Sequence, residues 1–333
     1  MKAVTLTVED TNRAAPAVPD RNIAMELVRA TEAAAIRASS WVGKGRKNDA
    51  DGAAVDGMRA FLSTVHFDGV VVIGEGEKDN APMLFNGEHV GDGLGPSCDI
   101  AVDPVEGTSL TAAGRPNALS VLAVSDRGSM YDPSAVFYMD KLVAGPEGVG
   151  VVDIRNPIAE NIRALAKAKR KSVDDIRVAV LDRPRHEKLI AEIREAGAGV
   201  HLLLDGDVAG GITAASYDSP VDLCVGIGGS PEGIITACAV KGLGGLIQGV
   251  LAPRDDAERQ KALDAGHVLD RVLEADDLVR GDNTYFVATG ITSGDLVRGV
   301  ERTSRVIRTE SLVLRSASGT VRRVISEHLP AKW

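Results

Sequence analysis

Hydrophobic positions along the chain follow two different periods. Residues 20–42 place apolar side chains at helical spacing, with Asp20 as a candidate N-cap and Gly43 after the last turn, so they are predicted to form a helix. The stretches GVVVIGEGEKD and DIAVDP are short β-branched runs that end in polar loops, which is typical of buried strands. Residues 118–126 and 141–154 are interpreted as further strands.

From about residue 157 the pattern becomes a regular alternation of helices and strands, which predicts an α/β architecture with a parallel sheet. The chain from residue 284 returns to strand-like segments, TYFVATGIT, ESLVLRS and TVRRVIS, with a Ser-Gly turn between the last two. The opening 20 residues have no apolar core and contain Glu9, Asp10 and Asp20. We expect a disordered tail there rather than a signal or transit peptide.

Composition narrows the class of protein. The 333 residues are 44% hydrophobic and 26% charged, as expected for a globular protein, and no apolar run reaches the roughly 18–20 residues that span a bilayer. A net charge of −9 and an aromatic content of 3% argue against a nucleic-acid partner, and we expect no membrane partner. The three cysteines are odd in number and lack metal-ligand spacing, which favours the reducing cytoplasm.

Acidic residues gather where predicted strands end. The segment DIAVDPVEGTSLT contains Asp99, Asp103 and Glu106, and Glu88 lies upstream. Carboxylates repel one another, so such a group is stable only if positive charge lies between them. The alternative is a solvated turn, begun by Asp-Pro and closed by Gly.

Three loops share this design, a strand followed by Asp, Glu and Gly: GEGEKD at 74–79, DPVEGT at 103–108 and DGD at 205–207. Ligands of α/β proteins bind where strands end, so these loops are predicted to converge on one site. Oxygen ligands without His or Cys suit Mg²⁺ or Mn²⁺, and Asp51 in KNDADGAA can add another carboxylate. Bound cations would also make an anionic substrate compatible with the acidic composition.

Two further motifs are typical of phosphate recognition. GIGGSPEGI, residues 226–234, is a Gly-rich strand end before a helix, although Pro231 replaces the third glycine of a dinucleotide fingerprint. Glu232 there is either a metal ligand or an acid that favours the helix N-terminus. In LDRPRHEK, Arg183 and Arg185 flank Pro184 and suit bidentate phosphate binding, or they are two exposed arginines. His186 is predicted to lie at the surface.

Taken together, these motifs resemble the motifs of a known family of enzymes. DPVEGT matches the D-P-x-[DE]-G-T signature of the lithium-sensitive, metal-dependent phosphatase superfamily, which includes inositol monophosphatases and fructose bisphosphatases. With KNDADGAAVD, VVIGEGEKDNAPML, PRH, DGDVA, GIGGSPEG and VATGITSGDL in this order, residues 21 to 327 resemble class II fructose-1,6-bisphosphatase.

The resemblance implies a layered α/β sugar-phosphatase fold like that of fructose bisphosphatases and inositol monophosphatases. We predict a disordered tail at 1–19 and a metal-binding phosphatase domain at 20–172. An α/β sugar-phosphate-binding domain is predicted at 173–333, with the strands of 284–327 packing back on the first domain.

The resemblance also implies site residues. The metal ligands would be Asp51, Glu75, Asp103, Glu106 and Glu232. Substrate contacts would be Glu106, Gly107, Thr108, Tyr138, Arg183, Pro184, Arg185, Asp205, Gly206, Asp207 and Gly229. The catalytic groups would be Thr108, Glu106, Asp79 and Lys47. Arg183 stands where some members have Lys, and its hydrogen-bond geometry differs accordingly.

The expected activity is hydrolysis of the 1-phosphate of fructose 1,6-bisphosphate in gluconeogenesis, with Mg²⁺ or Mn²⁺ and a water that attacks in line. The expected partners are a sugar bisphosphate and further copies of the chain in a dimer or tetramer. Two alternatives stay open. One is the same chemistry on sedoheptulose 1,7-bisphosphate or an inositol phosphate, and the other is a non-catalytic sugar-phosphate sensor.

Overall fold

The computed structural model describes residues 23–75, 84–217 and 219–333, and its strands form two mixed sheets. The strands of the first sheet are β1 (Asp68–Ile73), β2 (His89–Val90), β3 (Ser97–Glu106), β4 (Leu119–Asp126), β11 (Tyr285–Gly290), β12 (Glu301–Arg302), β13 (Ile307–Arg315) and β14 (Thr320–His328). Their order is β12-β13-β11-β4-β3-β1-β2, and β14 pairs with β13 on the side away from β11. β1 and β3 are parallel, and the other described pairs are antiparallel.

The second sheet contains β5 (Tyr138–Ala144), β6 (Arg177–Leu181), β7 (Gly199–Leu203), β8 (Leu223–Gly229), β9 (Leu246–Leu251) and β10 (Leu273–Glu274). Its order is β10-β9-β5-β8-β6-β7. β6 runs parallel to β7 and β8, whereas β5 is antiparallel to both of its neighbours.

The α-helices are α1 (Ala24–Ser39), α2 (Lys47–Leu62), α3 (Thr108–Ala113), α4 (Ile158–Lys169), α5 (Glu187–Glu195), α6 (Val208–Ala215), α7 (Ser230–Leu243), α8 (Asp256–Asp264) and α9 (Ala275–Leu278). Short 3₁₀ helices are η1 (Pro146–Gly148), η2 (Val173–Asp175), η3 (Pro184–His186), η4 (Ser316–Ser318) and η5 (Pro330–Lys332). No helix in the described ranges combines the length and the apolar character that crossing a membrane requires.

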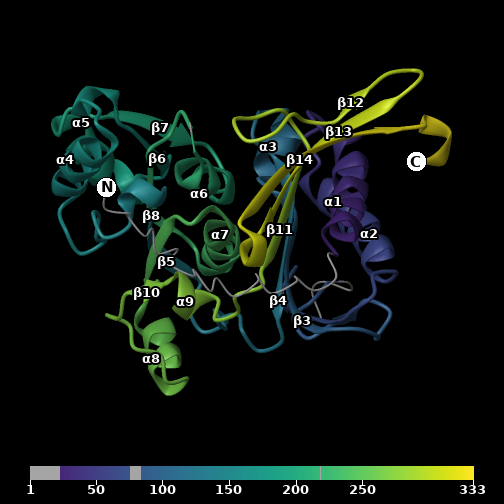
Figure 1. Cartoon of the computed structure of the whole chain (residues 1–333), viewed down its shortest axis with the longest axis horizontal. Coiled ribbons are helices and arrows are strands. Elements are labelled where there is room, and N and C mark those ends of the chain that lie inside the picture. The colour runs from purple at the N-terminus through teal and green to yellow at the C-terminus, as the bar shows by residue number, and fades with distance from the viewer. Residues whose placement is uncertain (1–22, 76–83, 218) are drawn as a thin grey trace, which may run out of the picture.

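These elements stack in five layers (Figure 1). α1 and α2 cover one face of the first sheet, α6 and α7 lie between the two sheets, and α4 and α5 cover the outer face of the second sheet (Figure 1). α7 is hydrophobic nearly all round, as a helix between two sheets must be. α1 is rich in alanine, and α2 packs closely against it at Gly57. A Cβ at this glycine would come within 2.8 Å of the Ala33 carbonyl oxygen.

The predicted layered α/β class is confirmed, with two local differences. Residues 149–154 form turns rather than a strand, because Gly150 takes a left-handed φ of 70° that ends the extended run. The second sheet is mixed rather than parallel, since β5, β9 and β10 join it antiparallel. α1 is described from Ala24, so Asp20, the predicted N-cap, lies outside the described residues.

The strands from residue 285 onward complete the first sheet, whereas β5, which precedes residue 173, belongs to the second. The chain therefore crosses between the sheets twice. The division of the chain into domains at residues 172 and 173 stays a prediction.

Candidate active site

Two acids at the end of β3 point the same way because the strand is irregular there. Asp103 is opposite Val121 of β4, but Glu106 is opposite Leu119, so three steps on β3 match two on β4. Residues three apart in a regular strand face opposite sides, and the extra residue of this bulge removes that difference. The turn that follows uses Gly107 in the left-handed region, at a φ of 83°.

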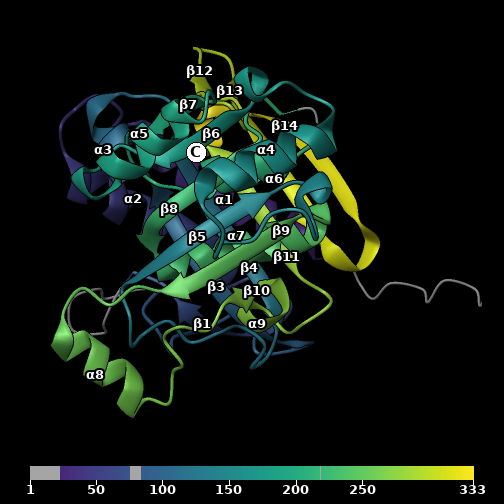
Figure 2. The same cartoon turned by 90° about the vertical axis from the view of Figure 1, so that its left-hand side faces the viewer.

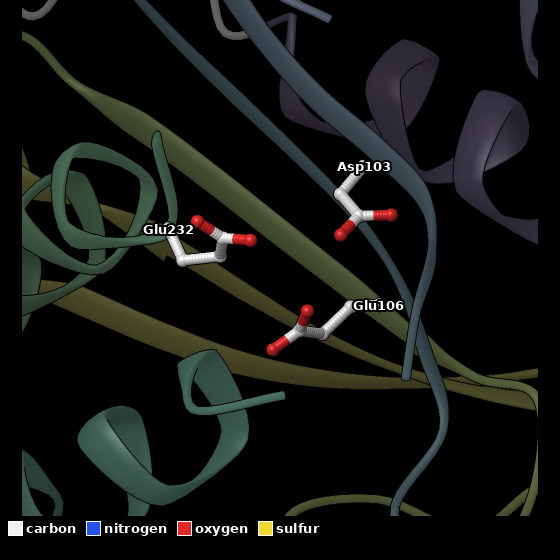
Figure 3. A group of neighbouring side chains, drawn as sticks. All are labelled: Asp103, Glu106 and Glu232. Carbon is white, nitrogen blue, oxygen red and sulfur yellow. The ribbon is translucent and has the colours of Figure 1, made fainter. Parts of the chain in front are cut away.

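Glu232 completes a three-carboxylate cluster from the other sheet. It lies in the first turn of α7, after β8, with Pro231 at the start of the helix. One carboxylate oxygen from each of Asp103, Glu106 and Glu232 lies within 4.8 Å of the others. The three side chains point toward one another (Figure 3).

The electrostatics of this cluster fit a divalent cation. Burial, together with the charge of Glu232, raises the pKa of Glu106 to about 8, and burial beside Glu106 raises the pKa of Asp103 well above its usual range. Burial also raises the pKa of Glu232. Glu232 Oε2 is buried and has no hydrogen-bond partner within the described ranges. Oxygen ligands of this kind, without nitrogen or sulfur, are those that Mg²⁺ and Mn²⁺ prefer.

Asp51 and Glu75 flank the cluster. Burial raises the pKa of Asp51 despite a hydrogen bond from Thr108, and burial and then the charge of Asp51 raise the pKa of Glu75 to about 7. Asp51 and Glu75 thus lie within electrostatic range of each other, and Glu75 also contributes to the raised pKa of Asp103, after burial and Glu106. Asp79 lies outside the described residues.

Two side chains of α2, Asp51 and Lys47, contact the start of α3 at Thr108 and Ser109. The Thr108 hydroxyl lies 3.2 Å from Asp51 Oδ1 and 3.1 Å from the Val105 carbonyl oxygen, and it can donate to either. Lys47 Nζ donates to Ser109 Oγ at 2.6 Å. Because Thr108 gives its proton to one of these acceptors, the lone pairs of its oxygen remain available to a further donor.

A second group of side chains links α3 to the β6 and β7 loops. Ser109 N–H donates to Asp205 Oδ2 at 3.2 Å, and Asp205 Oδ1 accepts from Arg183 Nη2 at 2.9 Å. Arg185 donates through Nε and Nη2 to the Ile227 carbonyl oxygen, and its guanidinium lies 4.8 Å from the centroid of the Tyr138 ring. The sequence did not indicate that Ser109 joins the two sides.

Glycines allow the acids to approach the backbone. A Cβ on Gly206 would lie 2.5 Å from Glu106 Oε1, and one on Gly229 would lie 1.8 Å from Glu232 Oε2. Glu106 Oε1 also accepts the Val208 N–H at 3.0 Å, at the start of α6. Gly206 of DGD and Gly229 of GIGG therefore allow these acids to approach the backbone, because a side chain at either position would collide with a carboxylate.

Lys141 is a further candidate site residue that was not predicted from the sequence. Its buried ammonium lies 2.6 Å from Asp207 Oδ2 and donates to the Gly229 carbonyl oxygen at 3.0 Å. Burial lowers its pKa, but the charges of Asp207 and Glu232 outweigh burial and raise the pKa overall. The available signal was one lysine in the otherwise apolar run KLVAG, which indicates a buried charge with a partner.

The prediction that His186 lies at the surface is wrong. The side chain is buried, its Nδ1 lies 2.8 Å from the Leu181 carbonyl oxygen, and its Nε2 accepts the Ile227 N–H at 2.8 Å. A buried imidazole with one donor and one acceptor is neutral, and burial lowers its pKa. His186 thus ties the arginine loop to β8 beside Arg185, a role that sequence neighbours alone do not indicate.

Two of the acids around β3 belong to separate ion pairs. Asp99 accepts the Met130 N–H and lies 3.7 Å from Arg127 Nε. Glu88 Oε1 pairs with Arg59 Nε at 2.6 Å. Their positive partners are protein side chains, whereas Asp103, Glu106 and Glu232 form no ion pair with any described residue.

Known proteins of similar sequence belong to one family. The model of the family described as bacterial fructose-1,6-bisphosphatase, glpX-encoded, matches residues 21–328. The chain is 44% identical over 323 residues to fructose-1,6-bisphosphatase 1 class 2 of Escherichia coli K12, covering 92% of this chain and 95% of that protein. The fructose-1,6-bisphosphatase class 2 of Shigella flexneri has the same identity and coverage.

Proposed function

The chain belongs to the family of bacterial, glpX-encoded fructose-1,6-bisphosphatases, and from this we propose that it hydrolyses fructose 1,6-bisphosphate to fructose 6-phosphate and inorganic phosphate. It is a phosphatase, and the step serves gluconeogenesis. The observation that supports a metal-assisted mechanism most directly is the cluster of Asp103, Glu106 and Glu232, in which one buried oxygen has no hydrogen-bond partner among the described residues.

The carboxylates hold Mg²⁺ or Mn²⁺ in this proposal. Asp103, Glu106 and Glu232 form the centre, with Asp51 and Glu75 as the flanking ligands. When bound, the metal supplies positive charge that offsets the phosphate oxygens and the charge building on the leaving oxygen. Cation binding would also offset the burial and the mutual repulsion that raise the pKa values of these acids.

Thr108 orients the attacking water. Its hydroxyl proton is directed to Asp51 or to the Val105 carbonyl, so an Oγ lone pair accepts a hydrogen bond from the water. Lys47 approaches the same turn through Ser109 and adds positive charge beside the reacting phosphate. Asp79 completes the catalytic group in our proposal.

The sugar and its distal phosphate bind on the side of the second sheet. The phosphate that is not cleaved binds to Arg183, Pro184, Arg185 and Tyr138 in this proposal. The Arg185 guanidinium lies over the Tyr138 ring, so these two side chains are already together. Asp205, Gly206 and Asp207 accept sugar hydroxyls, and Lys141 holds the Asp207 carboxylate in place. Gly107 and Gly229 let the backbone come close to the substrate.

A phosphate-release assay tests the proposal. Fructose 1,6-bisphosphate should be hydrolysed with Mg²⁺ or Mn²⁺, not in excess chelator, and again after metal is restored. Parallel assays with sedoheptulose 1,7-bisphosphate and an inositol monophosphate identify the preferred substrate. Binding of fructose 1,6-bisphosphate without phosphate release under every metal condition would instead identify a sugar-phosphate sensor.

We place the protein in the cytoplasm, where its three free, buried cysteines remain reduced. We also propose that it acts as a homo-oligomer, a dimer or tetramer.

A further inference from the structure

β14 forms an open edge of the first sheet. All nine of its residues pair with β13, from Ile307 opposite His328 to Arg315 opposite Thr320. Within the described ranges it pairs with no other strand. β14 lies at the right-hand rim of the molecule in Figure 2. Alternate N–H and C=O groups of an edge strand point outward and can pair with another chain.

The C-terminal end of β14 is held against α2 by aromatic contacts. The Trp333 ring stacks on Phe61 of α2 at 5.5 Å, and His328 contacts the Trp333 ring edge-on at 4.8 Å. The Thr309 hydroxyl lies 3.0 Å from His328 Nε2. The strand is therefore a preformed surface, and pairing along it requires little further ordering.

One face of β14, together with Leu329 directly after the strand, carries apolar side chains that solvent reaches. Val321, Ile325 and Leu329 are 46%, 66% and 67% exposed. Because side chains two apart share a face of a strand, Arg323 and Glu327 lie between them on the same side. The sequence of this face is apolar, basic, apolar, acidic, apolar.

We propose that β14 pairs with β14 of a second copy of this chain, antiparallel, about a two-fold axis at Ile325. Ile325 then lies opposite the partner's Ile325, Arg323 opposite the partner's Glu327, and Val321 opposite the partner's Leu329. A two-fold axis repeats each contact, so the interface is self-complementary. The two first sheets become one continuous sheet across the dimer.

The charges select this register over its neighbours. Centring the pairing on position 323 or 327 would set Arg323 or Glu327 opposite itself. Centring it on position 324 or 326 would set the apolar Ile325 opposite Arg323 or Glu327. Like charges directly opposite each other destabilise strand pairs, whereas opposite charges stabilise them.

The ion pairs within each chain extend this pattern. Arg323 Nη1 lies 3.3 Å from Glu310 Oε1, and Arg308 Nη2 lies 2.5 Å from Glu327 Oε1. In the dimer the charges alternate from Glu310 to Arg323, then to the partner's Glu327 and the partner's Arg308. The side chains set the register, while about eight new backbone hydrogen bonds and the apolar contacts contribute to affinity.

Cysteine cross-linking tests the register. The native cysteines are buried, so Ile325→Cys introduces an exposed thiol at the axis. Under mild oxidation this variant should form a disulfide-linked dimer, since residues directly opposite in paired strands fit disulfide geometry. Val321→Cys is the matched control: its two copies would lie about 26 Å apart along the strands and should not cross-link. A mixture of Val321→Cys and Leu329→Cys should cross-link.

The proposal is overturned if wild-type protein sediments as a monomer, or if it is oligomeric and Ile325→Cys fails to cross-link. Charge exchange supplies a second measurement. Arg323→Glu alone and Glu327→Arg alone each place two like-charge pairs across the axis and should weaken dimerisation about tenfold or more. A mixture of the two variants has two opposite-charge pairs and should recover the affinity.

Arg323→Glu loses the ion pair with Glu310, and Glu327→Arg loses the ion pair with Arg308, whether each variant is alone or in the mixture. A gain in affinity on mixing therefore comes from contacts between the chains. A mixture that associates no more tightly than either variant alone contradicts the proposed axis. Sedimentation velocity gives the association state, and circular dichroism verifies that each variant is folded.

Discussion

The two ends of β8 show two ways to bury a carboxylate. Asp222, just before the strand, lies 2.7 Å from Lys169 Nζ and 2.7 Å from Lys171 Nζ and accepts the Arg177 N–H at 3.0 Å. Burial raises its pKa, but these contacts outweigh burial and hold the pKa below the usual range. Glu232, just beyond the strand, faces two other acids, and its pKa is raised.

We interpret this difference as that between a structural acid and a proposed metal ligand. Asp222 has its cations within the chain and contributes to the stability of the folded state. Glu232 and its neighbours have carboxylates as their nearest charged contacts apart from Lys141, so the folded chain without metal is under electrostatic strain. A buried cluster of this kind is stable when an external cation binds it.

The largest effect should come from removing one member of the cluster. Glu106→Gln should lower kcat by at least about 10³-fold, because it removes charge from the metal centre. The same change should stabilise the metal-free protein, since it relieves repulsion. Asp222→Asn is the matched control and should lower stability by about 1–3 kcal/mol while phosphate release is retained. Equal activity loss in the two variants would remove the distinction between the two ends of β8.

Thr108 sharpens the comparison at an uncharged group. Thr108→Ala should lower kcat about 10²–10⁴-fold with little change in KM, because water orientation gains value only toward the transition state. Thr108→Ser retains the hydroxyl and should keep part of the rate. If Thr108 only stabilises the start of α3, Thr108→Ala should cost about 1 kcal/mol and leave kcat near wild type. Steady-state kinetics and a urea melt distinguish these outcomes.

Arg185 tests the substrate side. Arg185→Ala should chiefly raise KM for fructose 1,6-bisphosphate and lower kcat/KM about 10- to 150-fold, as expected for a lost charge-assisted contact of about 1.5–3 kcal/mol. Arg185→Lys keeps the charge but loses the paired N–H groups, so its kcat/KM should lie between those of the wild type and Arg185→Ala. An unchanged KM in Arg185→Ala would mean that the arginine serves only to hold Ile227.

The smallest effect is a pH dependence of stability in the metal-free protein. Glu106 has a folded-state pKa raised to about 8 and Glu75 one raised to about 7, from an unfolded value near 4.5. The folded state therefore binds more protons than the unfolded state between these values, and the free energy of unfolding should fall as pH rises from about 5 to 8.

Urea melts in chelator at pH 5.5 and pH 8.5 measure this slope, and saturating Mg²⁺ should flatten it. Glu106→Gln should also reduce it, because the group that titrates is gone. A metal-free protein that becomes more stable toward pH 8.5 would show that other groups dominate the balance.

The sequence predicted the acids at strand ends because the carboxylates are local features of the loops that carry them. It predicted the strands of β1 and β3 and the α1 helix for the same reason. The residues by themselves left Glu232 open between a metal ligand and an acid at a helix start, and only the family resemblance grouped it with Asp103, since their meeting depends on how two sheets pack around α7. Lys141 and His186 were missed because their contacts join residues 66 and 41 positions apart, respectively.

The central claim is that the cluster of Asp103, Glu106 and Glu232 is a metal site, and calorimetric titration of chelator-stripped protein with Mn²⁺ tests it most directly. Wild-type protein and Asp222→Asn should bind Mn²⁺ alike, whereas Glu232→Gln should bind it at least tenfold more weakly. Unchanged Mn²⁺ affinity in folded Glu232→Gln would contradict the assignment.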